Sequence, residues 1–453
     1  MKKRTGPTAI EGRIQAPPSK SYAQRAIAVA AMAEGRSVIL SPGSSDDVLA
    51  AVNVVRQLGA RVERWPLKSP PPGKTDAGKG SAGERSRTGE RGTGTVKATG
   101  LERQAEEGLV IDGGLQQPEG VLDCGEAGLS VRMFSAVAAL FDRPVTLTGR
   151  GSLLKRPMVV IEESLRAMGV ECTTVNGCLP VTVSGPLPGG KALIDGSFSS
   201  QVLTGILIAS PYAASDVTLL VNNLKSRPYI DMTLMVMELF GVEVENRGYS
   251  EFIIRHGQRY LPREYRVEGD WSGAAFLLVA GAIGGSVTVE NLDTSSPQAD
   301  RAIVDALGRA GANVATGTGE VTVSHGNLKA FEFDATDCPD LFPPLVTLAA
   351  FCEGTTTVRG AERLLHKESN RAATLSKEFG KLGVAVKVTG DIMKIKGGGC
   401  NGGTVESHGD HRIAMACATA AVAAHGEVLI EGAEAVAKSY PRFFEDLDRL
   451  RKV

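Results

Sequence analysis

The chain has 453 residues, enough for two or three domains. Hydrophobic residues make up 42% of it and aromatic residues only 5%, which indicates a globular protein with an aliphatic core. The formal net charge of −1 argues against a general polyanion or nucleic-acid binder, so any anion site must be built locally from cations that the fold gathers.

Cysteines, histidines and apolar runs exclude further classes of protein. The 7 cysteines form no C-x-x-C pair and the 6 histidines show no H-x-x-x-H spacing, so we expect neither a disulfide framework nor a metal site. The longest apolar runs hold about a dozen residues, whereas a membrane-spanning helix needs roughly 20. The N-terminus lacks the apolar segment of a signal peptide. We therefore expect a cytoplasmic protein.

The first predicted helix carries an unusual pair of charges. From Tyr22 onward the residues are small or apolar and include no proline, and Ser19 or Ser21 stands at the position of a helix cap. Lys20 and Arg25 crowd its first turns, where cations are unfavourable by some tenths of a kcal/mol. A bound anion would make them favourable.

A pattern of turn, apolar helix, glycine and β-rich run recurs six times along the chain. The six copies lie at 19–40, 127–149, 199–221, 270–292, 341–361 and 410–433. A second helix that stops at a glycine and leads into a strand follows the first five copies, at 54–64, 164–174, 237–246, 307–316 and 379–388. The sixth partner, 443–453, is shortened. The unit is therefore helix–strand–helix–strands, with a period near 70 residues.

The interval between the first two copies is longer by roughly 40 residues. The excess, 68–100, is rich in Gly, Lys, Arg and Ser and almost free of apolar residues. Such a composition cannot offset the chain entropy lost on folding, so we predict a mobile surface insertion. A basic arm for nucleic acid is less favoured because Glu and Asp are interspersed.

Six units predict two domains of three units each. The first helix of each unit is apolar nearly all round and should lie inside its domain. Three such helices side by side would have their N-termini at one end. Two domains that face each other would then bring six helix starts to a common cleft.

The six helix starts share polar and cationic residues. N-capping explains the serines and aspartates among them, but not the four cations. They are Lys20, Ser21 and Arg25; Gly128 and Arg132; Ser199, Ser200 and Gln201; Asp270 and Ser272; Asp340; and Asp410, His411 and Arg412.

Further cations stand in loops that the repeat should aim the same way. They are Lys155, Arg156, Arg227, Lys367, Arg371 and Lys438. Lys367 and Arg371 are spaced to share one face of a helix, although 366–371 taken alone favours a solvated charged helix. Helix N-termini, Arg forks and Lys charges that converge suit a ligand with several phosphate or carboxylate groups.

Six segments of the chain resemble 5-enolpyruvylshikimate-3-phosphate (EPSP) synthases, also called 3-phosphoshikimate 1-carboxyvinyltransferases. They are PPSKSYAQRA, GSFSSQVLT, SRPYIDMTL, HKESNR, GDHRIAMA and KSYPRFF. The resemblance implies an α/β (α+β) fold of two similar domains, each of three βαβαββ repeats with buried parallel helices, around an active site in the interdomain cleft. The domains would be 19–266 and 1–18 plus 267–453, with two chain crossings.

The resemblance also implies an activity. The enolpyruvyl group of phosphoenolpyruvate would pass to the 5-hydroxyl of shikimate 3-phosphate with release of phosphate, in the shikimate pathway to chorismate and aromatic amino acids. We expect no cofactor, no metal, no nucleic acid, no membrane contact and a monomer.

Individual roles follow from the matching positions. Asp340 would accept the hydroxyl proton, Glu368 would handle the proton at C3, and Lys20 would lie close to the reacting atoms. Taken without the family, Asp340 has a less favoured alternative as a helix N-cap. The expected shikimate 3-phosphate contacts are Lys20, Ser21, Arg25, Ser199, Ser200, Gln201, Ser226, Tyr229, Asp340 and Lys367. The expected phosphoenolpyruvate contacts are Lys20, Gly128, Arg156, Arg371, Arg412 and Lys438.

The chain departs from the family pattern at four positions. Glu126 and Leu129 replace the Asn and Thr of an Asn-Ala-Gly-Thr run, and Met133 stands where Pro often follows. Glu126 adds a negative charge near the expected phosphoenolpyruvate site. Arg363 stands where the family often has Asn, as a possible contact of shikimate 3-phosphate.

Two alternative functions remain. The sister enzymes that act on UDP-N-acetylglucosamine usually carry a reactive Cys before their Arg-Pro, where this chain has Gly151, and Lys-Asn where it has Lys20 and Ser21. Both differences favour the shikimate branch. A non-catalytic protein that binds an anionic metabolite is the other alternative, and the presence of Lys20, Asp340 and Glu368 argues against it.

Overall fold

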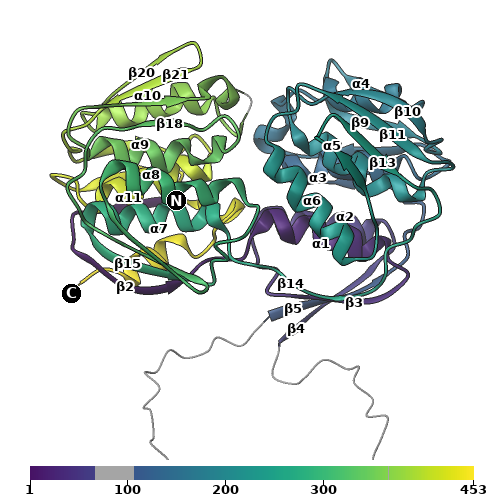
Figure 1. The fold of residues 1–453 in the computed structure, drawn as a ribbon, viewed down its shortest axis with the longest axis horizontal. Helices are drawn as coiled ribbons and strands as arrows, with labels where there is room; N and C mark the ends of the chain where they lie inside the picture. Colours follow the sequence, from purple (N-terminus) through teal and green to yellow (C-terminus); the bar gives the residue numbers. More distant parts are fainter. Residues whose placement is uncertain (67–106, 366, 453) are drawn as a thin grey trace, which may run out of the picture.

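The computed structural model describes residues 1–66, 107–365 and 367–452 (Figure 1). The predicted insertion at 68–100 lies outside the described residues. Within the described part, the helices and strands alternate in the predicted order of helix, strand, helix and strands.

The described strands form six small sheets, five of four strands and one of three. Each four-stranded sheet joins a parallel pair to an antiparallel hairpin. Three sheets hold β3 (Gly35–Leu40), β4 (Arg61–Pro66), β5 (Glu107–Gly113) and β14 (Glu264–Arg266); β6 (Leu122–Asp123), β7 (Val145–Thr148), β8 (Glu171–Val175) and β9 (Cys178–Ser184); and β10 (Gly190–Asp195), β11 (Val217–Asn222), β12 (Glu245–Arg247) and β13 (Glu251–Ile254).

The other three sheets repeat this plan with one change. They hold β2 (Ile10–Gln15), β15 (Gly285–Glu290), β16 (Asn313–Gly317) and β17 (Glu320–Ser324); β18 (Glu332–Asp334), β19 (Thr355–Arg359), β20 (Ala385–Thr389) and β21 (Ile392–Lys396); and β1 (Lys2–Thr5), β22 (Gly403–Glu406) and β23 (Val428–Glu431). In the last sheet β1 pairs antiparallel with β23. In the other five units this position beside the central strand is taken by a hairpin strand that follows it in the sequence. The N-terminal strand thus completes the shortened sixth unit.

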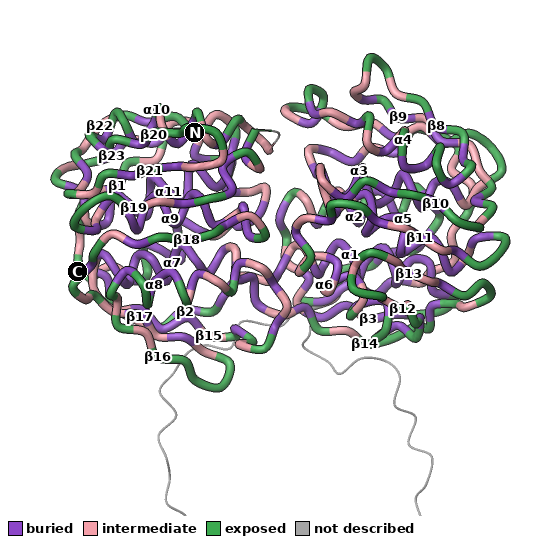
Figure 2. Tube along the Cα trace, turned by 45° about the horizontal axis from the view of Figure 1, so that its top comes forward, coloured by how far each residue is buried: buried purple, intermediate pink, exposed green. Residues whose placement is uncertain are grey.

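The helices fall into an inner and an outer set. The inner helices are α1 (Lys20–Met32), α3 (Gly128–Ala138), α5 (Ser200–Ala209), α7 (Trp271–Gly284), α9 (Phe342–Ala350) and α11 (His411–Ala421). The outer helices are α2 (Asp46–Gln57), α4 (Val159–Ala167), α6 (Arg227–Leu239), α8 (Ile303–Ala310), α10 (Arg371–Lys381) and α12 (Phe443–Arg449). Every residue of α3, α9 and α11 is buried, which confirms the prediction that the apolar helices lie inside (Figure 2).

Short 3₁₀ helices stand at several of the loops between these elements. They are η1 (Gly151–Lys155), η2 (Ser210–Tyr212), η3 (Ala299–Ala302), η4 (Pro339–Leu341), η5 (Ala361–Leu364) and η6 (Ala433–Lys438). Four of them carry or adjoin residues of the site described below.

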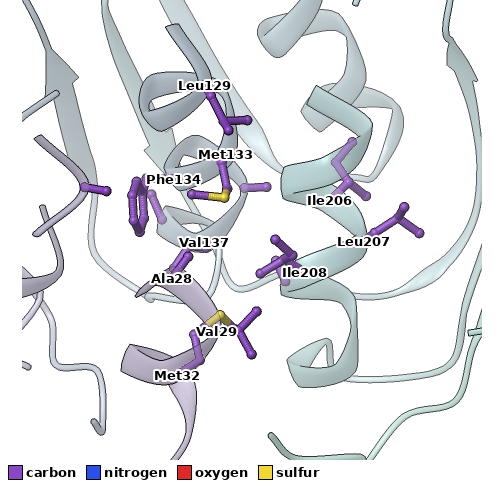
Figure 3. Close-up of a cluster of buried hydrophobic side chains, with 14 of the residues drawn as sticks. Ala28, Val29, Met32, Leu129, Met133, Phe134, Val137, Ile206, Leu207 and Ile208 are labelled. Carbon is purple, nitrogen blue, oxygen red and sulfur yellow. The ribbon is translucent and has the colours of Figure 1, made fainter. Parts of the chain in front are cut away.

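Buried hydrophobic side chains form two separate core clusters. One draws on residues between Tyr22 and Val267, and the other on Ile10–Ala16 and on residues from Trp271 to Leu450. We call the parts around them the first and second lobe (Figure 1). In the first lobe α3 packs against α5 and α1 through buried apolar side chains, which include Met32, Met133 and Phe134 (Figure 3). Gly205 lets α5 approach α3, because a Cβ there would lie 2.8 Å from the Cα of Met133.

The two connections between the lobes run side by side. Before α1, β2 pairs with β15 of the second lobe; before α7, β14 pairs with β3 of the first lobe. Pro18 and Gly269 form an antiparallel bridge at the crossing, and the Asp270 amide donates to the Pro17 carbonyl at 2.7 Å. This pairing holds the starts of α1 and α7 close together.

Side-chain capping is only partly as expected. Ser199, Asp270 and Asp410 accept hydrogen bonds from backbone amides of their helices, as predicted. Ser19 is the N-cap of α1, but its side chain makes no capping bond and instead donates to Gln298 at 3.3 Å. Among the described residues, no helix has the length and apolar character needed to cross a membrane.

Candidate active site

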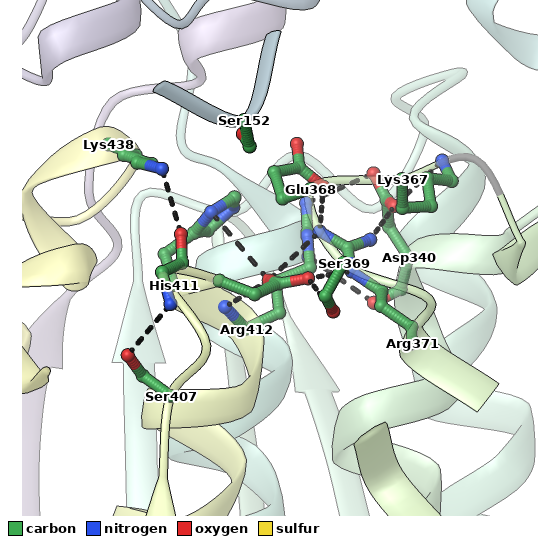
Figure 4. Close-up of polar contacts among 12 residues, drawn as sticks. Ser152, Asp340, Lys367, Glu368, Ser369, Arg371, Ser407, His411, Arg412 and Lys438 are labelled. Atoms are coloured by element: carbon green, nitrogen blue, oxygen red, sulfur yellow. Dashed lines mark hydrogen bonds and ion pairs between the residues drawn. The ribbon is translucent and has the colours of Figure 1, made fainter. Parts of the chain in front are cut away.

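Asp340 is the centre of a cationic cluster in the second lobe. It lies in the 3₁₀ turn η4, directly before α9. Its Oδ1 accepts hydrogen bonds from Lys367 Nζ at 3.1 Å and from Arg371 at 2.7 Å, and its Oδ2 accepts one from Arg412 at 3.1 Å (Figure 4). Its side chain makes no helix-capping bond, so the N-cap interpretation of Asp340 was wrong.

Arg371 joins two further carboxylates, Glu368 and Asp410, to this cluster. Its guanidinium donates to Glu368 at 2.5 Å and to Asp410 at 2.8 Å, besides Asp340. The side chain is 1% exposed, so its charge is balanced almost entirely by these three acids rather than by water. Asp410 also accepts from the Arg412 amide at 3.0 Å, which couples the start of α11 to the start of α10.

The segment that carries Lys367 and Glu368 differs from its prediction. Helix α10 begins only at Arg371, after the capping residue Asn370, and Lys367 precedes it in a bend. Lys367 and Arg371 therefore share no helix face, and the segment is not a solvated helix. The segment instead makes ion pairs with Asp340, which is distant in the sequence. The helical spacing rule considers only neighbours along the chain and so cannot predict these pairs.

The cations shift the pKa values of both acids. Burial by itself would raise the pKa of Asp340, but Arg412, Lys367 and Arg371 outweigh it and hold that pKa well below its usual value. Burial opposes Arg371 and Arg156 in the same way at Glu368, and the pKa of Glu368 also lies well below its usual value. Both side chains are thus anionic at neutral pH in this arrangement.

Arg25 is a buried cation in the first lobe with no acidic partner in the described chain. From α1 it donates to Thr233 Oγ1 at 2.9 Å and to the carbonyls of Ser21 at 2.8 Å and Tyr229 at 3.1 Å. Burial lowers the pKa of this guanidinium to about 10. Because its partners are neutral oxygens, an anion would gain strongly by binding beside it.

Two more arginines meet at the start of α3. Arg132 is buried and donates to the Gly128 carbonyl at 3.1 Å and to Gln201 Oε1 at 3.2 Å. Burial, and then the neighbouring charge of Arg156, lower the pKa of Arg132 to about 9. The Nε of Arg156 is buried and has no hydrogen-bond partner among the described residues. A Cβ at Gly128 would lie 2.5 Å from the Arg156 guanidinium, so any other residue there would displace this side chain.

Two lysines, Lys20 and Lys438, lie close to charged groups of the opposite lobe. Lys20, at the start of α1, pairs with Asp47 of α2 at 2.7 Å, and its charge acts on Glu368 of the second lobe. Lys438, at the end of η6, pairs with Glu126 of the first lobe at 2.7 Å. Lys20 and Lys438 thus lie with the other cations of the site, whereas two expected members, Lys155 and Arg227, are exposed, and Arg227 lies over the ring of Tyr249.

The lobes also touch on the side of Ser226. Arg363 of the second lobe donates to Ser226 Oγ at 2.9 Å and to the carbonyls of Ser197 and Phe198 at 3.0 Å. The Ser226 amide donates to Asp337 at 2.7 Å. Ser199 and Ser200 begin α5 a few residues from these contacts, and Ser199 accepts from the Gln201 amide.

Several residues of the site carried no sequence signal for their partners. No sequence pattern marks Asp47, and a helix start predicts Asp410 only as a cap, although Asp410 also holds Arg371. The sequence indicates Arg132 as a cation for a bound anion but assigns it to neither substrate. His411 is buried, neither of its ring nitrogens has a hydrogen bond in the described chain, and burial and Lys20 keep the pKa of its ring well below the usual value. No group of three or more His, Cys, Asp or Glu suited to a metal ion occurs among the described residues.

Solved structures define the class. The fold resembles the EPSP synthase of Acinetobacter baumannii with a TM-score of 0.77 and 27% identity, covering 99% of this chain and 98% of that one. The enolpyruvyl transferase NikO from Streptomyces tendae shares the fold with a TM-score of 0.73 at 17% identity, covering 99% of this chain and 96% of that one. The structure is thus that of an enolpyruvyl transferase fold, as predicted.

Sequence comparisons define the family within this class. The family model described as EPSP synthase (3-phosphoshikimate 1-carboxyvinyltransferase) matches residues 4–77 and 94–447. Curated relatives named 3-phosphoshikimate 1-carboxyvinyltransferase include those of Clostridium novyi, 36% identical over 98% of this chain and 96% of the relative, and Aeropyrum pernix, 39% identical over 98% and 94%. The chain belongs to the EPSP synthase family, which confirms the predicted resemblance.

Proposed function

We propose that this chain transfers the enolpyruvyl group of phosphoenolpyruvate to the 5-hydroxyl of shikimate 3-phosphate and releases phosphate. Membership of the family supports this reaction. The observation that carries it at the level of the site is the pair of partly buried acids, Asp340 and Glu368, joined by Arg371 at 2.7 and 2.5 Å. Two acids among several cations are what an addition to a doubly anionic enol ester requires.

The chemistry needs two proton transfers. The hydroxyl oxygen of shikimate 3-phosphate bonds to C2 of phosphoenolpyruvate while its proton leaves to a base, and C3 gains a proton from an acid. Loss of phosphate from C2 and of a proton from C3 then restores the double bond. In this proposal Asp340 takes the hydroxyl proton and Glu368 handles the proton at C3, with Lys20 beside the reacting atoms.

The low pKa of each acid sets a condition on this scheme. A carboxylate held by three cations is a weak base. Bound phosphates and carboxylates compete for Lys367, Arg371 and Arg412, which weakens the hold of these residues on Asp340 and raises its basicity. Negative charge of phosphoenolpyruvate near Arg371 and Arg156 raises the pKa of Glu368 in the same way. The substrates themselves therefore activate the two acids.

The remaining contacts divide between the substrates. We assign to shikimate 3-phosphate the residues around Arg25 and Arg363, and to phosphoenolpyruvate those around Arg132 and Arg156. The first set is Lys20, Ser21, Arg25, Ser199, Ser200, Gln201, Ser226, Tyr229, Asp340 and Lys367, and the second is Lys20, Gly128, Arg156, Arg371, Arg412 and Lys438. Support comes from the buried guanidinium groups of Arg25 and Arg132, which only neutral oxygens contact in the described chain.

We also propose that 19–266 and 1–18 plus 267–453 are the two domains and that the cleft between them is the site. The two separate core clusters and the paired crossing at Pro18 and Gly269 support this division. A monomeric state and a cytoplasmic location remain predictions from the sequence.

A sister reaction on UDP-N-acetylglucosamine is not favoured. The loop before Arg156 has Gly151 in place of the sister enzymes' reactive cysteine, and all of the curated relatives described above are 3-phosphoshikimate 1-carboxyvinyltransferases.

One assay tests the proposal. Purified protein is mixed with phosphoenolpyruvate and shikimate 3-phosphate without added metal, and phosphate release is followed, with UDP-N-acetylglucosamine as control acceptor. We expect release only with shikimate 3-phosphate. Phosphate release only with the control acceptor would assign the sister reaction to this chain. Release with neither acceptor would favour a non-catalytic binding protein.

A further inference from the structure

Glu126 forms a three-way contact at the edge of the proposed phosphoenolpyruvate site. It lies two residues before α3, and its Oε2 accepts from Lys438 Nζ of the second lobe at 2.7 Å. The same oxygen accepts from the Ser152 amide and hydroxyl, both at 3.2 Å. Ser152 belongs to the loop that ends at Arg156. One carboxylate oxygen thus joins three segments from two lobes.

The ammonium of Lys438 is held by groups from both lobes. Besides Glu126 it donates to the Gly409 carbonyl at 2.8 Å, one residue before Asp410. An ammonium has three hydrogens, so these two bonds fix the direction of the third. The side chain of Lys438 is 12% exposed, and that of Glu126 is 27% exposed. The pair is therefore partly shielded from water, where an ion pair is worth more than on an open surface.

Gly151 provides the room for this arrangement. A Cβ at position 151 would lie 2.4 Å from the Glu126 carboxylate, and the φ of +58° disfavours any other residue. The position that carries a reactive cysteine in the sister enzymes is thus filled by the Glu126 side chain. Glu126 and Gly151 depend on each other, which makes an incidental surface pair a poor explanation of the contact.

We propose that Glu126 is a positioning residue for phosphoenolpyruvate, which acts by docking Lys438 of the second lobe onto the loop that carries Arg156 in the first. The phosphoenolpyruvate site is then completed only when the lobes are together. This inference rests on the proposed function, because it assigns Lys438 to that substrate.

The opposite effect, competition between Glu126 and the substrate for Lys438, is outweighed by two features. Arg132 and Arg156 leave a surplus of positive charge at the start of α3 that Glu126 does not contact. A free lysine side chain also loses rotamer entropy when a ligand fixes it, and here Glu126 and Gly409 fix Lys438 in advance.

Steady-state kinetics of Glu126→Ala, Glu126→Gln and wild type test the proposal. Glu126→Ala should raise KM for phosphoenolpyruvate about tenfold, with KM for shikimate 3-phosphate and kcat within twofold. The KM of Glu126→Gln for phosphoenolpyruvate should lie between the values of wild type and Glu126→Ala, because glutamine keeps an acceptor for Lys438. In a Lys438→Ala background, Glu126→Ala should add nothing to KM for phosphoenolpyruvate. A lower or unchanged KM in Glu126→Ala, or an equal rise in both KM values, overturns the proposal.

Two matched controls separate the docking role from general damage. Gly151→Ala should reproduce the KM effect of Glu126→Ala by displacing the carboxylate, whereas Gly248→Ala, at a φ of +62° with open space around it, should not. Glu245→Gln removes an exposed pair with Arg247 at 2.7 Å and should leave all constants unchanged. Equal effects of Gly151→Ala and Gly248→Ala count against the proposal.

A measurement without turnover keeps the two proposals apart. If wild type releases no phosphate, the proposed function fails, and the docking role is judged by small-angle scattering instead. Loss of the contact between lobes should increase the radius of gyration of Glu126→Ala over wild type and over Glu245→Gln. Identical values for all three overturn the docking role.

Discussion

Replacing Asp340 by asparagine separates the roles of charge and shape at the centre of the site. The amide oxygen can still accept from Lys367 and Arg371, which the wild-type Oδ1 does at 3.1 and 2.7 Å. The amide NH2 must then face Arg412, where Oδ2 accepts at 3.1 Å in the wild type. The variant loses one acceptor and the charge that balances three cations.

The expected magnitudes follow from these contacts. Breaking a buried ion pair by removing one partner costs about 3–5 kcal/mol. Asp340 is 19% exposed, and Glu368 and Asp410 still hold Arg371, so we expect the lower end, about 3 kcal/mol of unfolding free energy. Loss of a general base reduces turnover by roughly 10²–10⁴-fold. Affinity for shikimate 3-phosphate should be kept or improved, because a negative charge leaves an anion site.

Three measurements check Asp340→Asn: phosphate release, calorimetric binding of shikimate 3-phosphate, and chemical denaturation with and without that ligand. The ligand should restore part of the lost stability, since its negative charges take the place of the missing carboxylate. Asp334→Asn is the matched control, since Asp334 lies in the same segment and accepts hydrogen bonds from the neighbouring Thr336, whose amide is 3.0 Å away. Turnover within threefold of wild type would refute the assignment of Asp340 as the base.

Three further outcomes are expected. Arg156→Ala should raise KM for phosphoenolpyruvate at least tenfold with little change for shikimate 3-phosphate, and the reverse pattern in initial-rate kinetics contradicts the assignment. Arg25→Lys should lower the unfolding free energy by about 2 kcal/mol, because an ammonium cannot reach Thr233, Ser21 and Tyr229 together; unchanged denaturation would show that these bonds contribute nothing. Burial, followed by the charge of Asp340, raises the pKa of Asp300 from 3.8 to about 7, so the stability from its protonated form is complete below pH 3.8 and lost as the pH rises through 7. Asp300→Asn should therefore stabilise the protein at pH 8 by up to roughly 4 kcal/mol relative to its effect at pH 4, and a pH-independent difference in denaturation argues against this.

The architecture could be predicted from the sequence because it repeats. An apolar helix that must be buried, followed by a glycine and a β-rich run, recurs with one spacing, and each unit needs neighbours to cover its core. The repeat does not predict that strands near the N-terminus pair with strands of much later units. The pairing of β1 with β23 and of β2 with β15 joins segments separated by most of the chain, and no local pattern near the N-terminus specifies it.

The site could be predicted as a set of cations but not as a network. Lys20, Arg25, Arg132 and Arg412 stand out because a helix start disfavours positive charge. Their partners do not, since an aspartate at a helix start is already explained by capping. Asp410 does both, as it caps α11 and holds Arg371 at 2.8 Å. The helical spacing assigned to Lys367 and Arg371 failed for the same reason, because it considers only neighbours along the chain.

The charge balance of the site explains how it can bind anions and still fold. Arginines as deeply buried as Arg371 and Arg412 would be costly if left unpaired, and Asp340 and Asp410 compensate them within the protein. Arg25 and Arg132 have no such partner in the described chain, so in the proposed function the two anionic substrates would supply the missing charge there. The internal carboxylates and the bound substrates should therefore be able to balance the same cations. Asp340→Asn would then be stabilised by shikimate 3-phosphate more than wild type is, and a smaller stabilisation would show that the cations of the two lobes are independent.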